Sequence, residues 1–220
     1  MTQESKKASA FPPIGSYGFL SDCHTSCLVA PDGSVEWLCV PRFDSPSVFG
    51  SILDRTAGRF RFGPKGVSVP LSRRYEPGTL VLETTWSTDG GWLVVRDALT
   101  IAEWSPSGEA GETGIRHEAD LSMVRVAECI EGEVDLEMVC EPRFAYGSQA
   151  AVWTGGELGE AEAQSDADGT TLALATDLNL ELEQGQATGT LKLKEGDRAF
   201  CSLAWGVGID GHPRSAPEST

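Results

Sequence analysis

The sequence predicts an all-β protein, a large antiparallel β-sandwich (a supersandwich) with one short helix after the N-terminal hairpin. Three observations support this fold class. Apolar and polar residues alternate along many short segments, as they do in strands with one buried and one wet face. Turn residues separate these segments roughly every 8–12 positions, the spacing of sandwich proteins. Helical periodicity is scarce, and no repeat of solenoid or propeller length is present.

The first hairpin is expected close to the N-terminus. Residues 26–30 and 34–38 flank Pro31-Asp32-Gly33, which is a turn signal. A second turn signal, Asp44-Ser45-Pro46, precedes the one segment with a helical pattern. We therefore predict a short helix over Val48–Asp54.

The remaining strands follow in hairpins. Residues 79–86 and 92–97 are joined through Asp89-Gly90, a strong hairpin signal. A further hairpin is predicted from residues 121–129 and 134–144, with its turn at Glu131-Gly132-Glu133. Four more strands are expected at residues 171–176, 178–183, 189–194 and 199–205. Segments 105–114 and 155–170 are rich in Gly, Glu and Ser, so we expect exposed loops there.

One sandwich domain accounts for most of the chain. A length of 220 residues lies near the upper end of what a single hydrophobic core serves. We expect a flexible tail over residues 1–13, the sandwich domain over 14–208 and a linker-like tail over 209–220.

Charge excludes several partners. Residues 1–100 hold ten basic and ten acidic residues, whereas residues 101–220 hold seven basic and twenty-three acidic residues, which accounts for the net charge of −16. An acidic surface repels phosphate backbones and anionic lipids, so we expect no nucleic-acid or membrane partner. No segment approaches the about 20 apolar residues of a spanning helix. The polar N-terminal residues do not resemble a secretory signal, and a cytoplasmic location is expected.

The cysteines and the short motifs of the sequence do not indicate a metal or cofactor site. The six cysteines are expected to be free and mostly buried, because the predicted hairpin keeps Cys129 away from Cys140. Cys23, Cys27 and Cys39 lie near His24 but lack the paired spacing of a zinc site. No phosphate-binding loop, dinucleotide fingerprint or metalloprotease motif occurs, so no metal and no cofactor is expected. His117 and His212 lie in polar segments and give little support to a catalytic triad.

The loop from Trp37 to Pro46 is the candidate site. It combines aromatic, charged and proline residues, and its prolines restrict the backbone. An aromatic ring can pack on the face of a sugar while an arginine and a carboxylate bond to its hydroxyls. An Arg42–Asp44 pair that only braces a corner is the alternative. The candidate residues are Trp37, Pro41, Arg42, Phe43, Asp44 and Ser45.

Several motifs resemble the opening of family 15 glycoside hydrolases, the glucoamylase-like and microbial trehalase-like enzymes. The N-terminal set is Ile14–Thr25, Leu28–Val29, Asp32–Cys39, Pro41–Pro46 and Phe49. The match continues through Arg73–Tyr75, Gly78–Thr84, Arg96–Asp97 and Pro142–Gly147. The resemblance extends from about Ile14 to Gly208, nearly the whole chain.

The resemblance implies an enzyme of two domains, with the catalytic residues outside this chain. In that family a β-supersandwich comes first, and an (α/α)6 barrel with two catalytic glutamates follows. One glutamic acid protonates the leaving oxygen while the other activates water, with inversion at the anomeric carbon. Neither glutamate maps onto this chain, so we expect no catalytic residue in it. The implied partners are an (α/α)6 catalytic domain, in cis or in trans, and an α-glucoside such as trehalose or maltose. The loop would contact the pocket rim or the barrel.

Two alternatives belong to other classes. The chain could be a stand-alone carbohydrate-binding or interaction module without catalysis. It could also be an enzyme that pairs carboxylates across the sandwich. The second alternative has little support, because Glu131, Glu133, Glu137, Glu181 and Glu183 fall at turns or outward positions. A general acid needs the raised pKa of a buried or like-paired carboxyl group.

Overall fold

A computed structural model describes residues 11–101, 121–155, 159–165, 169–183 and 185–205. It confirms the all-β fold. Within these ranges the 3-10 turn η1 (Ile14–Ser16) and the short helix α1 (Phe144–Gly147) accompany the strands. The strands are β1 (Gly18–Ser21), β2 (Ser26–Val29), β3 (Ser34–Cys39), β4 (Ser47–Phe49), β5 (Arg59–Pro64), β6 (Ser72–Tyr75), β7 (Leu82–Ser87), β8 (Gly91–Leu99), β9 (Ser122–Glu141), β10 (Gln149–Ala150), β11 (Val152–Gly155), β12 (Glu160–Gln164), β13 (Thr171–Thr176), β14 (Asn179–Glu183), β15 (Gln186–Lys194) and β16 (Arg198–Trp205).

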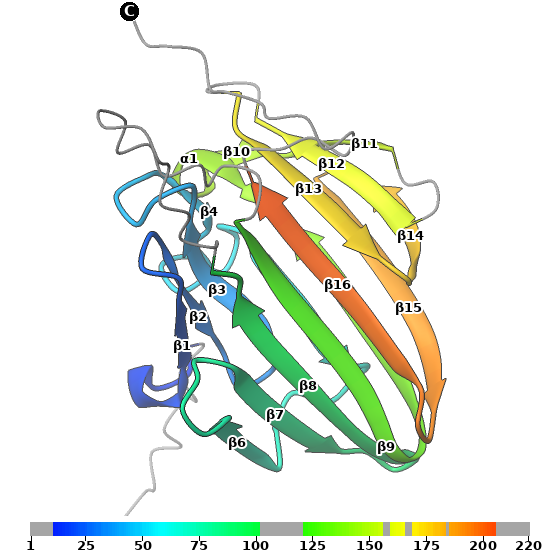
Figure 1. Ribbon diagram of the computed structural model, residues 1–220. Coiled ribbons are helices and arrows are strands. Elements are labelled where there is room, and N and C mark those ends of the chain that lie inside the picture. The colour runs from blue at the N-terminus through cyan, green and yellow to red at the C-terminus, as the bar shows by residue number, and fades with distance from the viewer. Residues whose placement is uncertain (1–10, 102–120, 156–158, 166–168, 184, 206–220) are drawn as a thin grey trace, which may run out of the picture.

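The strands form two antiparallel layers (Figure 1). One layer contains β1–β5, β14 and β15, and the other contains β6–β8, β11–β13 and β16. Strand β9 belongs to both layers. Its first half pairs with β8 and β16, and its second half pairs with β5 and β15.

The continuous course of β9 corrects the hairpin predicted at residues 131–133. Gly132 has a φ of 72°, and the pairing with β8 skips Ile130, two residues before it. This irregularity bends the strand from one layer into the other without reversing it. A reversal is unnecessary because each half already has a partner strand on both sides. Cys129 and Cys140 therefore lie on one strand, and all six cysteines are free, with only Cys23 exposed.

The predicted helix over Val48–Asp54 is wrong in position. Residues 47–49 form β4, which pairs with β3, and turns follow it. Ser47, Val48 and Phe49 are all buried, so this segment is covered on both faces and has no wet helical side. The short helix lies instead at Phe144–Gly147, against β4 (Figure 1).

Most of the other predicted strands are confirmed, and one of the predicted loops is wrong in part. The hairpins β2–β3 and β7–β8 are confirmed, as are the four strands β13–β16. Segment 155–170 is not all loop, because β12 lies within it and buries Ala161 and Ala163. Small alanines between acidic residues give too weak a hydrophobic alternation for recognition from sequence. Segment 105–114 lies outside the described residues.

The core between the layers encloses an ion pair. Trp86, Phe60 and Phe62 are fully buried there. Arg125 of β9 donates to Asp97 of β8 at 2.8 Å, and both side chains are 0 % exposed. Arg125 also donates to the backbone carbonyl of Phe60 at 2.7 Å, across to the other layer. This pair connects the two sheets at the centre of the molecule.

Candidate functional site

The candidate loop connects β3 to β4 at one end of the sandwich. Trp37 lies on β3 opposite Leu28 and is partly buried. The backbone N–H of Phe43 donates to the His24 carbonyl at 2.9 Å, so the loop rests on the turn between β1 and β2. Asp22 stabilises that turn by accepting from the N–H groups of His24 and Thr25. The candidate loop is thus a supported structure rather than an isolated protrusion.

The charged side chains of the loop contact each other. Arg42 Nε donates to Asp44 Oδ1 at 3.0 Å, and a second contact joins Nη2 to Oδ2 at 3.4 Å. The side chains are 65 % and 59 % exposed. An exposed pair of this kind contributes about 0–1 kcal/mol to stability. The pair therefore does little for the fold, and both groups remain accessible to a partner or a ligand.

The other predicted residues differ in their exposure to solvent. Phe43 is 68 % exposed, Pro41 is also exposed, and Ser45 is half-buried. The Ser45 hydroxyl accepts from the Arg42 N–H at 3.2 Å, which closes the loop on itself. The loop brings Pro41, Arg42, Phe43 and Asp44 to the surface together and leaves Trp37 as packing support.

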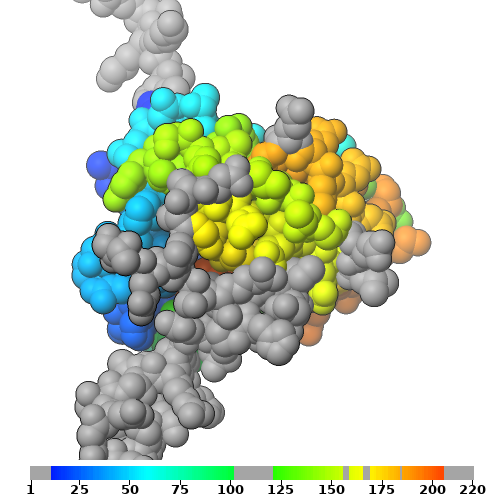
Figure 2. Space-filling view, turned by 90° about the horizontal axis from the view of Figure 1, so that it is seen from above, coloured from blue at the N-terminus to red at the C-terminus, as the bar shows by residue number. Residues whose placement is uncertain are grey.

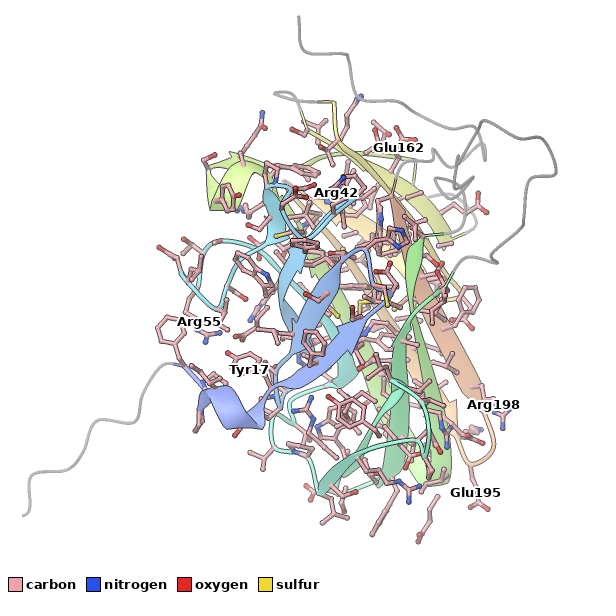
Figure 3. All side chains as sticks on the ribbon, turned by 60° about the vertical axis from the view of Figure 1, so that its left-hand side comes forward. Tyr17, Arg42, Arg55, Glu162, Glu195 and Arg198 are labelled. Atoms are coloured by element: carbon pink, nitrogen blue, oxygen red, sulfur yellow. The ribbon has the colours of Figure 1, made fainter. Side chains whose placement is uncertain are left out.

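A buried carboxylate lies beside this loop, and the sequence did not reveal it. Glu36 of β3 is 3 % exposed and accepts from the Tyr17 hydroxyl at 2.5 Å and from Arg55. Burial, followed by the hydrogen bond to Glu36, raises the pKa of Tyr17 to about 12. The Arg55 guanidinium also lies 4.2 Å from the ring centre of Phe11. Figure 3 shows Tyr17 and Arg55 near each other on the side that carries β1–β3.

Strained backbone occurs at the neighbouring corner, α1. Ala145 and Tyr146 have φ values of 49° and 58°, a left-handed conformation that costs non-glycine residues about 1–3 kcal/mol each. Buried Phe144 anchors the corner, and Gly147 packs so closely on Ala57 that an added Cβ would lie 2.6 Å from the Ala57 Cβ. Tyr146 itself is 59 % exposed. The packing of Phe144 and Gly147 thus keeps the backbone of Tyr146 in a strained conformation that leaves its side chain exposed to solvent.

Three of the described carboxylates have clearly shifted pKa values. The shifted pKa values of Glu83, Glu128 and Asp54 are all lowered. Burial raises the pKa of Glu83, but its bonds with Arg74 and Arg96 outweigh that effect. Arg198 and Arg96 lower the pKa of Glu128, and the Thr56 N–H lowers that of Asp54. A general acid requires the opposite shift. The five glutamates singled out in the sequence are exposed or half-buried.

The described ranges contain no group of metal ligands and no membrane-spanning helix. There, no three His, Cys, Asp or Glu side chains converge as a metal site requires. His24 is half-buried, whereas His117 and His212 lie outside those ranges. No helix within the same part of the chain is long and apolar enough to cross a membrane.

Comparisons with known proteins agree on one family. A family model described as "Trehalase-like, N-terminal" matches residues 6–153. A trehalase of Mycolicibacterium smegmatis is 50 % identical over 204 residues, which are 89 % of this chain and 30 % of that protein. A trehalase of Mycobacterium tuberculosis is 47 % identical over 93 % of this chain and 32 % of its own length. A trehalase of Thermoplasma volcanium is 28 % identical over 64 % of this chain. The chain spans about a third of the two mycobacterial proteins.

Proposed function

Because the chain belongs to the trehalase-like N-terminal domain family, we propose that it is the N-terminal β-sandwich of a trehalase-type α-glucoside hydrolase. In this proposal residues 14–208 pack on an (α/α)6 catalytic domain and shape its pocket. One observation carries the proposal: the chain matches trehalases at about half identity over nearly all of its own length but only a third of theirs.

The surface around β4 supports a docking role. Phe43, Leu53 and Tyr146 are 68 %, 67 % and 59 % exposed. They come from the loops before and after β4 and from α1, which contacts β4. A contiguous apolar patch formed by these three side chains would be typical of a protein interface. The accessible Arg42–Asp44 pair would add polar contacts to the partner domain or to sugar at the pocket rim.

The chemistry would then be divided between two domains. The catalytic domain would supply the carboxylic acid and the carboxylate of an inverting hydrolysis. The sandwich would hold one wall of the pocket in place and limit the access of water to the bond being broken. Trehalose is the first substrate to test because the relatives are named trehalases, and maltose is the second.

A chimeric enzyme tests the proposal. Residues 14–208 would replace the matched segment of the M. smegmatis trehalase, and glucose release from trehalose and maltose would be measured. We expect an active chimera and no release from the 220-residue chain alone, compared with a heat-treated control. Release of glucose by the chain alone would show that the sandwich holds its own catalytic carboxylates. A folded chimera without activity would contradict the proposed role.

Variants of the chimera with substitutions on the surface around β4 test whether that surface contacts the catalytic domain. Phe43→Asp places a charge in the proposed interface and should lower turnover at least about tenfold. Phe200→Asp is the matched control, because Phe200 is an exposed phenylalanine on β16, outside the segments around β4. Arg42→Ala and Asp44→Ala test the polar pair in the same assay. If both leave turnover and stability unchanged, the pair has no part in the pocket.

A further inference from the structure

A pocket lies where the N-terminal edge of one layer meets the edge of the other. Strand β1 is an edge of the first layer, and β6 is an edge of the second. The volume of the pocket is about 410 Å³, within the range of small-molecule sites. Figure 1 places β6 at the lower end of the molecule, whereas Figure 2 looks onto the upper end, which carries β4 and α1. The lining includes Gly15, Gly18, Pro31, Pro70, Arg73 and Leu82.

Arg73 of β6 brings a positive charge to the wall of this pocket. Its guanidinium is half-buried and donates to two backbone carbonyls, that of Ser16 and, at 2.9 Å, that of Val29. Each terminal nitrogen of a guanidinium carries two N–H groups, so each keeps one beyond the bond that it makes to a carbonyl. Gly18 leaves room for this arrangement, because a Cβ there would lie 3.0 Å from Arg73 Nη2 and 2.4 Å from Leu82 Cδ2.

The charge of Arg73 is not balanced by a carboxylate. No ion pair within the described ranges includes this arginine. Of the acids on the neighbouring strands, Asp97 is bound to Arg125 and Glu83 is bound to Arg74. Burial lowers the pKa of Arg73, so its surroundings disfavour the charge that it carries. A bound anion would supply the opposite charge and accept from the guanidinium.

The rest of the lining favours a particular kind of anion. Pro31, Pro70 and Leu82 offer C–H surface, which favours a ligand with a hydrocarbon part. One unpaired cation balances one negative charge. The net charge of −16 on the whole chain opposes a ligand with two negative charges more strongly than a ligand with one. A short monocarboxylate has both features, a single charge at one end and a hydrocarbon body.

We propose that the pocket beside Arg73 binds a small monocarboxylate with a hydrocarbon body. The carboxylate oxygens accept from the guanidinium of Arg73, and the hydrocarbon part lies against Pro31, Pro70 and Leu82. The lining contains no residue of the Trp37–Pro46 loop and none of the exposed side chains around β4. Binding at this site therefore needs no catalytic domain and is independent of the proposed docking role.

Butyrate, butyramide and inorganic phosphate test this proposal on the full chain. The amide signals of Gly15 and Gly18, both in the pocket wall, would be followed by NMR in ¹⁵N-labelled chain. A concentration of about 150 mM NaCl screens the exposed charges. We expect a saturable shift with millimolar butyrate and at least about tenfold weaker binding of butyramide, which has the same shape without the charge. Phosphate should also bind more weakly, because it has no hydrocarbon part.

Arg73→Met removes the charge and should abolish the shift caused by butyrate. Arg59→Met is the matched control, because Arg59 is an exposed arginine at the start of β5 and does not line the pocket. Circular dichroism shows whether each variant is folded. The three ligands are compared on the unaltered chain, so that comparison decides the proposal even if Arg73→Met does not fold.

Three results would overturn the proposal. The first is the absence of a saturable shift up to about 50 mM butyrate, a range that covers millimolar binding. The second is equal binding of butyrate and butyramide, which would show that the charge of the ligand is not recognised. The third is phosphate binding at least as tight as that of butyrate, which would show that the hydrocarbon part is not recognised. None of these results bears on the activity of the chimera.

Discussion

Arg125 and Asp97 form the most consequential contact between single residues. Burial lowers the pKa of Arg125, but the attraction of Asp97 outweighs burial and the pKa is raised. The arginine also lies 5.0 Å from the ring centre of Phe60. The cation is therefore fully compensated within the core, by charge, carbonyls and an aromatic face. Removing one partner leaves the other charged and desolvated.

We predict that Arg125→Met lowers the free energy of unfolding by about 3–5 kcal/mol, measured by urea denaturation. The double variant Arg125→Met/Asp97→Leu should recover a large part of this loss, because no unpaired charge remains. Arg42→Met is the control, since its partner Asp44 is exposed, and it should change stability by less than about 1 kcal/mol. Equal losses in Arg125→Met and Arg42→Met would refute the argument from burial.

Tyr17 gives a pH dependence in the alkaline range. Its pKa is about 12 in the folded chain against 10.0 for an ordinary tyrosine, so the folded state holds the phenolic proton more tightly. Its contribution to stability is therefore complete below pH 10 and is lost as the pH rises from 10 towards 12.

Tyr17→Phe should flatten this alkaline decline in the free energy of unfolding. The tyrosinate absorbance of wild type minus Tyr17→Phe should show a titration near pH 12. Tyr146→Phe removes an exposed tyrosine and serves as the control. An alkaline decline of equal steepness in wild type and Tyr17→Phe would exclude the ionisation of Tyr17 as its cause.

At the scale of elements, β9 depends on Gly132. A Cβ at this position would lie 2.2 Å from the Gly90 carbonyl oxygen, and its φ of 72° disfavours any other residue. We predict that Gly132→Ala lowers the free energy of unfolding by about 3 kcal/mol or more, through both the clash and the backbone strain.

Gly66→Ala is the matched control for this variant. Gly66 has a φ of 75° but no atom within 4 Å of an added Cβ, so only the backbone cost of about 1–2 kcal/mol applies. Denaturant unfolding of both variants separates the two effects. A loss for Gly132→Ala no larger than that for Gly66→Ala would show that the strand shifts to accommodate the methyl group.

Two of the hairpins follow from local sequence alone. Pro31-Asp32-Gly33 and Asp89-Gly90 predicted their hairpins because a tight turn depends on local backbone preferences. Gly132 carries the same local signal but bends a continuous strand, because β5 and β15 are available to pair with its second half. The local preference of glycine allows a positive φ. The partner strands available nearby determine whether that residue forms a tight turn or a bend within one strand.

At the scale of the whole molecule, the excess of acidic residues should oppose folding. The chain holds 33 acidic and 17 basic residues, and like charges repel more strongly in the compact state. We predict that the thermal midpoint rises when the NaCl concentration increases from about 10 mM to about 150 mM, because the screening length falls from about 30 Å to about 8 Å. Circular dichroism measures the midpoint. A falling midpoint would show that attractive ion pairs outweigh the repulsion.

The all-β class, most strand positions, the free cysteines and the family were predictable from the sequence, because alternation, turn residues and ordered motifs are local properties. The sequence also identified a loop whose Pro41, Arg42, Phe43 and Asp44 are exposed together. The course of β9 and the burial of Glu36 beside Tyr17 and Arg55 depend on contacts between distant segments and were not predictable from local patterns. Those features bring together residues that are distant in the chain. Strand pairing and the packing of the two sheets, and not local preference, determine which of these residues are in contact.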